Sequence, residues 1–324
     1  MSWDIAGHAA AVASFQTALA AGRVGHAYII SGQEGIGKAH LAKLLGQALL
    51  CSGAPAAAPC GECDNCHRVA SGHHPDVHWL VPDGASIRIE QVRALQSTLA
   101  LRPFSAKYKV CIIDGADLMT EQAQNSMLKS LEEPPGDGVL ILVTSRPSAL
   151  LPTILSRCQM VRLQPLAISA LAEYLQLKRG YTPVQARLVA ALCAGRCGRA
   201  LAADPEALIA QRDKVADWVA ALRKERLRGA LRISYELDKD ESLPETLDMA
   251  AVWFADIWHV WLAAGLPIVN EDNMAVLERE APLWREQASV ALAALSAARR
   301  MFQQNANRRL VLDIMLMKMQ RGLI

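Results

Sequence analysis

Several features that would narrow the function at once are missing from this 324-residue sequence. It has no apolar run of membrane-spanning length. Residues 1–21 have the pattern of a short amphipathic helix, not of a basic segment followed by an apolar core. The net charge is only +2, which argues against a chain that grips nucleic acid through a dense basic surface. We therefore expect a cytoplasmic protein, long enough for two or three domains.

Four of the eight cysteines lie close together in the sequence. Cys51, Cys60, Cys63 and Cys66 form the pattern C-x8-C-x2-C-x2-C. In the cytoplasm such a group indicates a metal site more often than a disulfide, and four thiolates complete the tetrahedral shell of Zn²⁺. Because a closed shell has no open position, the pattern predicts a structural zinc ion. The alternatives are four unrelated thiols or a disulfide pair.

A glycine-rich loop follows a short apolar run and precedes a helical stretch. Gly32, Gly35, Gly37 and Lys38 have the arrangement of a P-loop, whose backbone N–H groups surround phosphates while the lysine reaches the β and γ oxygens. The next residue should be Ser or Thr, because its hydroxyl binds Mg²⁺. Here it is Ala39. The loop predicts a nucleotide fold that lacks its metal ligand, and binding of ATP or ADP without hydrolysis stays open.

The other nucleotide-site motifs are also incomplete. An apolar strand ends in Asp114, the form of a Walker B carboxylate. ATPases of the AAA+ type follow this Asp with a Glu that polarises the attacking water, but Gly115 follows here and Asp117 comes two places later. Thr144 occupies the place of a polar sensor of the γ-phosphate. By register, Gly198 replaces the arginine of a second sensor.

The apolar pattern changes along the chain. In the first half, short apolar runs separated by helix-length segments predict a parallel sheet with helical crossovers. We expect an α/β P-loop domain over residues 1–165, with the four-cysteine module inserted at 51–66. Residues 166–204 are expected to form a small helical lid domain. Residues 205–324 have helical spacing and no convincing strand, which predicts an all-α C-terminal domain.

Further segments give the chain a family resemblance. They are residues 23–28, residues 125–135 with Glu132-Glu133-Pro134-Pro135, residues 152–158 with Ser156-Arg157-Cys158, and residues 305–319. Together with the inserted cysteine module, these segments resemble the clamp-loader subunits of bacterial DNA polymerase III, which are AAA+ proteins. The resemblance covers nearly the whole chain and is strongest from Gly25 to Leu163.

The resemblance implies partners and a role. The partners would be the motor subunit (gamma/tau), the delta subunit and, through the assembled complex, the sliding clamp and primed DNA. The C-terminal domain would be a collar that oligomerises. Motor subunits carry the residues missing at Ala39, Gly115 and Gly198. The chain is therefore expected to be a non-hydrolysing stator, a component of the DNA polymerase III holoenzyme (a nucleotidyltransferase complex) without ATPase activity of its own.

Within this family, the arginine of the Ser-Arg-Cys motif reaches into a neighbour's nucleotide site. The resemblance thus implies that Arg157 is an arginine finger acting in trans. A guanidinium is always charged and forks onto phosphate oxygens, so it can stabilise charge that develops in a transition state. The bare tripeptide, taken alone, favours a surface salt bridge or a cap on the preceding helix.

Two other functions stay open from the sequence. The first is a working ATPase of the same fold, in which Asp117 or Glu121 replaces the missing carboxylate. The second is a zinc-dependent nucleic-acid-binding module. The weak net charge, and the absence of interleaved basic and aromatic residues around Cys60–Cys66, count against this second function.

Overall fold

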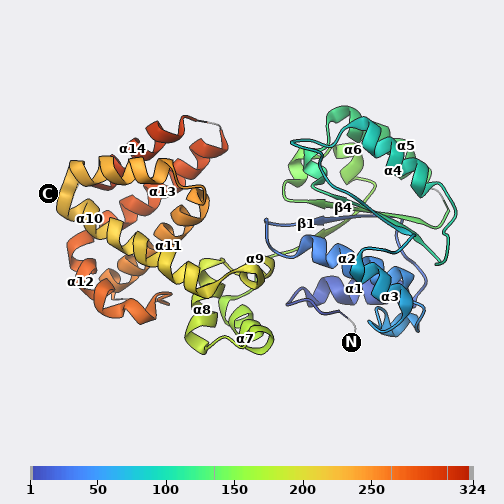
Figure 1. Ribbon diagram of the computed structural model, residues 1–324, viewed down its shortest axis with the longest axis horizontal. Coiled ribbons are helices and arrows are strands. Elements are labelled where there is room, and N and C mark those ends of the chain that lie inside the picture. The colour runs from blue at the N-terminus through green and yellow to red at the C-terminus, as the bar shows by residue number, and fades with distance from the viewer. Residues whose placement is uncertain (1–2, 135, 264, 305, 321–324) are drawn as a thin grey trace. The chain divides into compact units, whose positions relative to one another are not determined.

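The computed structural model describes residues 3–134, 136–263, 265–304 and 306–320, so Pro135 and Asn305 of the family segments lie outside the described residues. The chain forms two compact units (Figure 1). The first comprises Met1–Ala170 with Arg196–Arg199, and the second comprises Leu171–Gly195 with Ala200–Ile324. This division draws no boundary between a lid and a collar, so the domain limits at residues 165 and 204 stay predictions.

A five-stranded parallel sheet is the centre of the first unit. Its strand order is β2-β3-β4-β1-β5, and each neighbouring pair is parallel. The strands are β1 (Ala27–Ser31), β2 (Val77–Leu80), β3 (Lys109–Asp114), β4 (Gly138–Thr144) and β5 (Gln159–Arg162). The three inner strands are buried on both faces, which explains why they appear in the sequence as continuous apolar runs. The predicted parallel α/β sheet is confirmed.

Helices cover both faces of this sheet. They are α1 (Ala9–Ala20), α2 (Lys38–Leu50), α3 (Asp64–Ser71), α4 (Ile89–Leu99), α5 (Glu121–Glu132) and α6 (Pro152–Leu155), with short 3-10 turns η1 (Pro55–Ala57), η2 (Ala116–Leu118) and η3 (Pro147–Ala149). Successive strand residues point to opposite faces. Ile112 therefore joins the core with α1 and α2, while Cys111 joins the core with α4 and α5.

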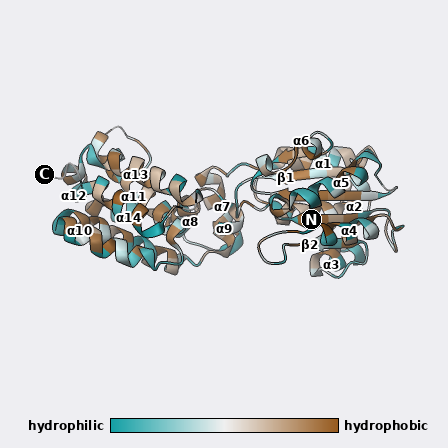
Figure 2. Ribbon diagram, turned by 90° about the horizontal axis from the view of Figure 1, so that it is seen from above, coloured by the Kyte–Doolittle hydropathy of each residue, from teal (hydrophilic) through white to brown (hydrophobic). Residues whose placement is uncertain are grey.

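The described residues of the second unit form helices and connecting loops, with no strand among them. The helices from residue 168 onwards are α7 (Ile168–Arg179), α8 (Pro183–Leu192), α9 (Cys197–Ala202), α10 (Pro205–Asp238), α11 (Leu243–Leu262), α12 (Met274–Trp284), α13 (Gln287–Gln303) and α14 (Arg308–Gln320), with the turn η4 (Glu271–Asn273). Apolar and polar residues alternate around them (Figure 2). Phe254 of α11 packs edge-to-face on Trp284, with the ring centroids 4.8 Å apart. No described helix is both long and apolar enough to cross a membrane.

Asp76, just before β2, fixes the loop that leads into β3. Its buried carboxylate accepts hydrogen bonds from the backbone N–H groups of Phe104 (2.6 Å), Ser105 (2.9 Å) and Ala106 (3.1 Å). Burial alone raises the pKa of Asp76, but these bonds outweigh burial and hold the pKa below its usual range. The loop therefore depends on a charged carboxylate.

Replacing Asp76 by asparagine is expected to lower the free energy of unfolding by about 2–3 kcal/mol at pH 7, because charge-assisted bonds are lost from a buried site. The folded-state pKa lies below that of the unfolded chain. The stabilisation is therefore complete above the unfolded pKa of about 4 and is lost as the pH falls through the folded pKa. In urea unfolding, the difference in free energy of unfolding between the wild type and Asp76→Asn should be constant near neutral pH and should become smaller in acid. The exposed Asp83→Asn serves as the control. Equal stability at pH 7 would contradict this account.

Candidate functional site

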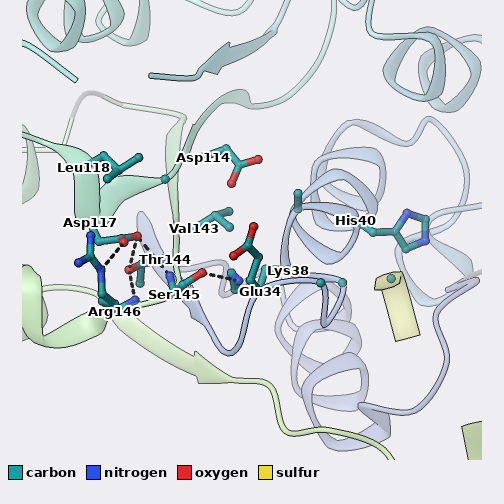
Figure 3. A pocket seen from close by; sticks show the side chains of 15 residues that line it. Glu34, Lys38, His40, Asp114, Asp117, Leu118, Val143, Thr144, Ser145 and Arg146 are labelled. Carbon is teal, nitrogen blue, oxygen red and sulfur yellow. Dashed lines mark hydrogen bonds and ion pairs between the residues drawn. The ribbon is translucent and has the colours of Figure 1, made fainter. Parts of the chain in front are cut away.

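The glycine-rich loop connects β1 to α2 at the carboxyl end of the sheet (Figure 3). Gly35 and Gly37 have φ values of +74° and +107°, in the region that favours glycine. Lys38 is the first residue of α2, and its Nζ donates to Gln33 O and to Ser145 Oγ, both at 2.9 Å. Burial lowers the pKa of Lys38, and the carboxylate of Asp114 opposes this effect. The lysine thus ties the loop to the end of β4.

A cavity of about 760 Å³ opens beside this loop. Five of the six residues predicted to contact nucleotide line it, namely Gly35, Gly37, Lys38, Asp114 and Thr144. The sixth, Gly32, is not among the lining residues, and an added Cβ on it would come within 2.9 Å of Leu163 O. Ala39 and Gly115 also line the cavity. Their side chains are a methyl group and a hydrogen atom, which offer neither a metal ligand nor a base.

Asp117 lines the same cavity, but its carboxylate oxygens are already engaged. Oδ1 accepts from Thr144 Oγ1 at 2.9 Å and from Ser145 N at 3.2 Å, and Oδ2 accepts from Arg146 Nε at 3.1 Å. Figure 3 shows these partners gathered around Asp117. Burial alone raises the pKa of Asp117, but the bonds outweigh it and lower the pKa. A carboxylate held in this way is a weak base towards water.

Glu121 and Thr144 are the other residues that the sequence suggests for activating water or sensing the γ-phosphate. Glu121 is exposed at the start of α5, outside the residues that line the cavity. Thr144 lines the cavity, but its hydroxyl proton goes to Asp117 while its oxygen accepts from Arg146 N at 3.0 Å. The sensor hydroxyl predicted from the sequence is thus hydrogen-bonded within the chain.

The start of α9 packs directly on the glycine-rich loop. Arg199 N donates to Gly35 O at 2.9 Å, and Gly198 lines the cavity. A Cβ on Gly198 would come within 2.8 Å of Gly35 O. This packing therefore has no room for a side chain at position 198, where the sequence register places the missing sensor arginine.

The four predicted metal ligands come together at one end of α2. The Sγ atoms of Cys51, Cys60, Cys63 and Cys66 all lie within 4.8 Å of one another, and none of these cysteines forms a disulfide. A tetrahedral zinc site with Zn–S bonds of about 2.3 Å has sulfurs about 3.8 Å apart. The separation between Cys60 Sγ and Cys66 Sγ is 4.0 Å. The donor set fits a single metal ion.

Backbone N–H groups favour the thiolate forms in this cluster. Cys51 Sγ accepts from Cys60 N, Cys60 Sγ from Cys63 N, and Cys63 Sγ from Cys66 N, each at 3.4 Å. Burial raises the pKa of Cys63, but hydrogen bonds from Ser52 and Cys66 outweigh it, so that the pKa is lowered to about 6. Burial raises the pKa of Cys66. Thiolate is the metal-binding form of cysteine.

Arg157 follows α6 and lies outside the cavity. Its Nη2 donates to Glu132 Oε1 at 2.8 Å, and its Nη1 donates to Thr153 O at 3.0 Å and to Ser156 Oγ at 3.3 Å. The side chain is 36% exposed. The single chain therefore shows both the salt bridge and the helix cap that the bare Ser-Arg-Cys tripeptide favours.

The parallel sheet, the glycine-rich loop and the carboxylate at the end of β3 define a P-loop type of protein whose site lacks its metal ligand. Residues 7–167 match the family described as "DNA polymerase III, delta subunit". Residues 7–167 of the chain therefore belong to that family of clamp-loader subunits.

The curated relatives agree with this assignment. The chain is 43% identical over 168 residues to DNA polymerase III subunit delta' of Bacillus subtilis, a match that covers 52% of this chain and 50% of the relative. It is 46% identical over 135 residues to the delta' subunit of Pseudomonas aeruginosa, covering 41% of each. Subunit tau of Escherichia coli is 34% identical over 174 residues, covering 53% of this chain and 27% of the relative. The chain thus spans about half the length of these relatives or less.

Several solved structures match over nearly all of the chain. One of them is a gamma subunit-related protein of Thermotoga maritima, matched over 93% of this chain and 95% of that chain at 19% identity and a TM-score of 0.44. The predicted resemblance to the clamp-loader subunits of bacterial DNA polymerase III is confirmed by the family and by these relatives, two of which are delta' subunits.

Proposed function

We propose that the chain is the non-hydrolysing stator, subunit delta prime, of a DNA polymerase III clamp loader. In this role it supplies Arg157 in trans to the nucleotide site of the adjacent motor subunit (gamma/tau). With the delta subunit, the assembled complex opens the sliding clamp and places it on primed DNA. The observation that carries the proposal is the engaged Asp117 in a cavity where Ala39 replaces the metal ligand.

The position of Arg157 supports the proposal that this arginine acts in trans. Arg157 lies outside the chain's own cavity and is partly exposed. A guanidinium has five N–H groups. Three of them are used by Glu132, Thr153 and Ser156, which leaves one on Nε and one on Nη2 without an acceptor among the described residues. Two N–H groups suit the forked contact that an arginine makes with phosphate oxygens.

The remaining parts have roles within the same proposal. Cys51, Cys60, Cys63 and Cys66 hold a structural Zn²⁺ ion. Residues 166–204 act as the lid, and residues 205–324 act as the collar that joins neighbouring subunits. Because Lys38 and the loop glycines are retained, ATP or ADP binding without hydrolysis is compatible with the stator role.

The purified chain is expected to release no phosphate from Mg²⁺-ATP above background, because the groups that bind the metal and activate water are missing at Ala39 and Gly115. The measurement is phosphate release by the wild type beside Lys38→Ala, which defines the background. Turnover that Lys38→Ala abolishes would refute this expectation. If Asp117→Asn abolished it as well, the chain would be a working ATPase with Asp117 as its base.

A further inference from the structure

Glu132 stands where a carboxylate is unfavourable for the helix that carries it. It is the last residue of α5, whose free carbonyl groups give this end a partial negative charge. Helix stability therefore does not account for a glutamate at this position. Its carboxylate lies instead 2.8 Å from Nη2 of Arg157, which is 25 residues away in the sequence.

The guanidinium of Arg157 is held from two elements at once. Glu132 contacts it from the end of α5, while Thr153 O and Ser156 Oγ contact it from α6 and the residue after it. These contacts lie on Nη1 and on one hydrogen of Nη2, so the Nε–H and the second Nη2–H stay available. Glu132 thus orients the guanidinium without using all of the donors that a phosphate group would need.

The strength of the pair suits an orienting contact. Both side chains are partly exposed, 36% for Arg157 and 52% for Glu132, and ion pairs this exposed contribute little to the stability of the fold. Removing the carboxylate should therefore leave the fold intact. A free arginine side chain loses rotamer entropy when it is fixed at a site. Holding the side chain in advance reduces that loss in the transition state.

We propose that Glu132 is a positioning residue that holds Arg157 in the orientation required for its action in trans. This inference rests on the proposed function of Arg157 as an arginine finger. The orienting contact acts on the finger before it meets the neighbour's nucleotide, so its loss reduces stabilisation of the transition state and not binding of ATP by the motor subunit.

The test uses the reconstituted clamp-loader complex with Glu132→Ala, Glu132→Gln and the matched control Glu133→Gln. Glu133 is the exposed residue next in the chain and has no ion pair among the described residues. We expect Glu132→Ala to lower kcat for ATP by about tenfold with KM unchanged, since small misplacements of a catalytic group have effects of this order or larger. Glu132→Gln keeps an acceptor for Nη2 and should restore part of the rate. Glu133→Gln should match the wild type.

Arg157→Ala in the same assay separates the two proposals. A fall in kcat with Arg157→Ala but none with Glu132→Ala would overturn the positioning role and leave the arginine finger in place. A rise in kcat with Glu132→Ala, or an effect on assembly or KM in place of kcat, would also overturn it. If Arg157→Ala had no effect, the proposed function itself would fail, and the role of Glu132 with it.

Discussion

In a reconstituted complex, Arg157→Ala is expected to slow ATP hydrolysis at the adjoining motor site by about 10³-fold while the complex still assembles. The reason is that an arginine finger neutralises charge on the transferring phosphoryl group, an effect worth about 10³ to 10⁵ in rate. Single-turnover hydrolysis at that site measures the effect, and gel filtration measures assembly.

Two further variants make this experiment specific. Arg157→Lys keeps the charge but not the fork of N–H groups, so most of the rate should still be lost. Arg162→Ala removes another exposed arginine, at the end of β5, and should have no effect on hydrolysis. Full activity of an assembled Arg157→Ala complex would exclude the finger role.

Removal of the metal is expected to have the second large effect. We expect one zinc ion per chain, and Cys66→Ala should abolish zinc binding and lower the free energy of unfolding by on the order of 5 kcal/mol. The basis is that structural zinc contributes about 10–16 kcal/mol in isolated zinc fingers. Metal analysis and urea unfolding are the measurements. Cys193→Ala, which changes a cysteine outside the cluster, should keep the zinc.

Hydrogen bonds from the cluster explain why the loss of zinc should destabilise more of the chain than the four cysteines. Asn65 Nδ2 donates to Leu50 O at 2.7 Å, and Gln47 Nε2 donates to Cys66 O at 3.0 Å. These bonds join the cluster to the C-terminal end of α2, the helix that begins with Lys38. Protein purified without chelator that contains no zinc, or an unfolding transition that chelation leaves unchanged, would contradict the structural zinc site.

Features encoded by neighbouring residues could be predicted from the sequence. The inner strands are continuous apolar runs because both faces of a parallel sheet are covered, and this pattern is local. The cysteine cluster is local as well, because Cys63 caps α3 and Cys66 lies in its first turn. In the glycine-rich loop, the positive φ values of Gly35 and Gly37 require the residue type that marks the motif.

Features that depend on which strands are neighbours could not be predicted. Asp117 follows β3 and its partner Arg146 follows β4, 29 residues later. They meet because β3 and β4 are adjacent, so that their carboxyl ends lie at the same edge of the sheet. The sequence shows each strand but not this order. It therefore leaves Asp117 open as a replacement base, whereas the structure shows its oxygens engaged.

The same limit applies elsewhere in the chain. The pair between Glu132 and Arg157 joins the ends of two helices, and no motif links them.

In the helical unit, α10 is interrupted at Arg226, where φ is 50° and ψ is −130°. A non-glycine residue rarely adopts such a backbone conformation. The glycine near the break is Gly229, three residues later, where an added Cβ would come within 3.0 Å of Ala221 O.

The central claim is that this chain contributes an arginine to its neighbour's site and no chemistry at its own loop. The most direct test is ATP turnover by the reconstituted complex that carries either Lys38→Ala or Arg157→Ala in this chain. We expect Lys38→Ala to leave turnover unchanged and Arg157→Ala to nearly abolish it at the adjoining motor site. A complex that loses turnover with Lys38→Ala and keeps it with Arg157→Ala would contradict the account.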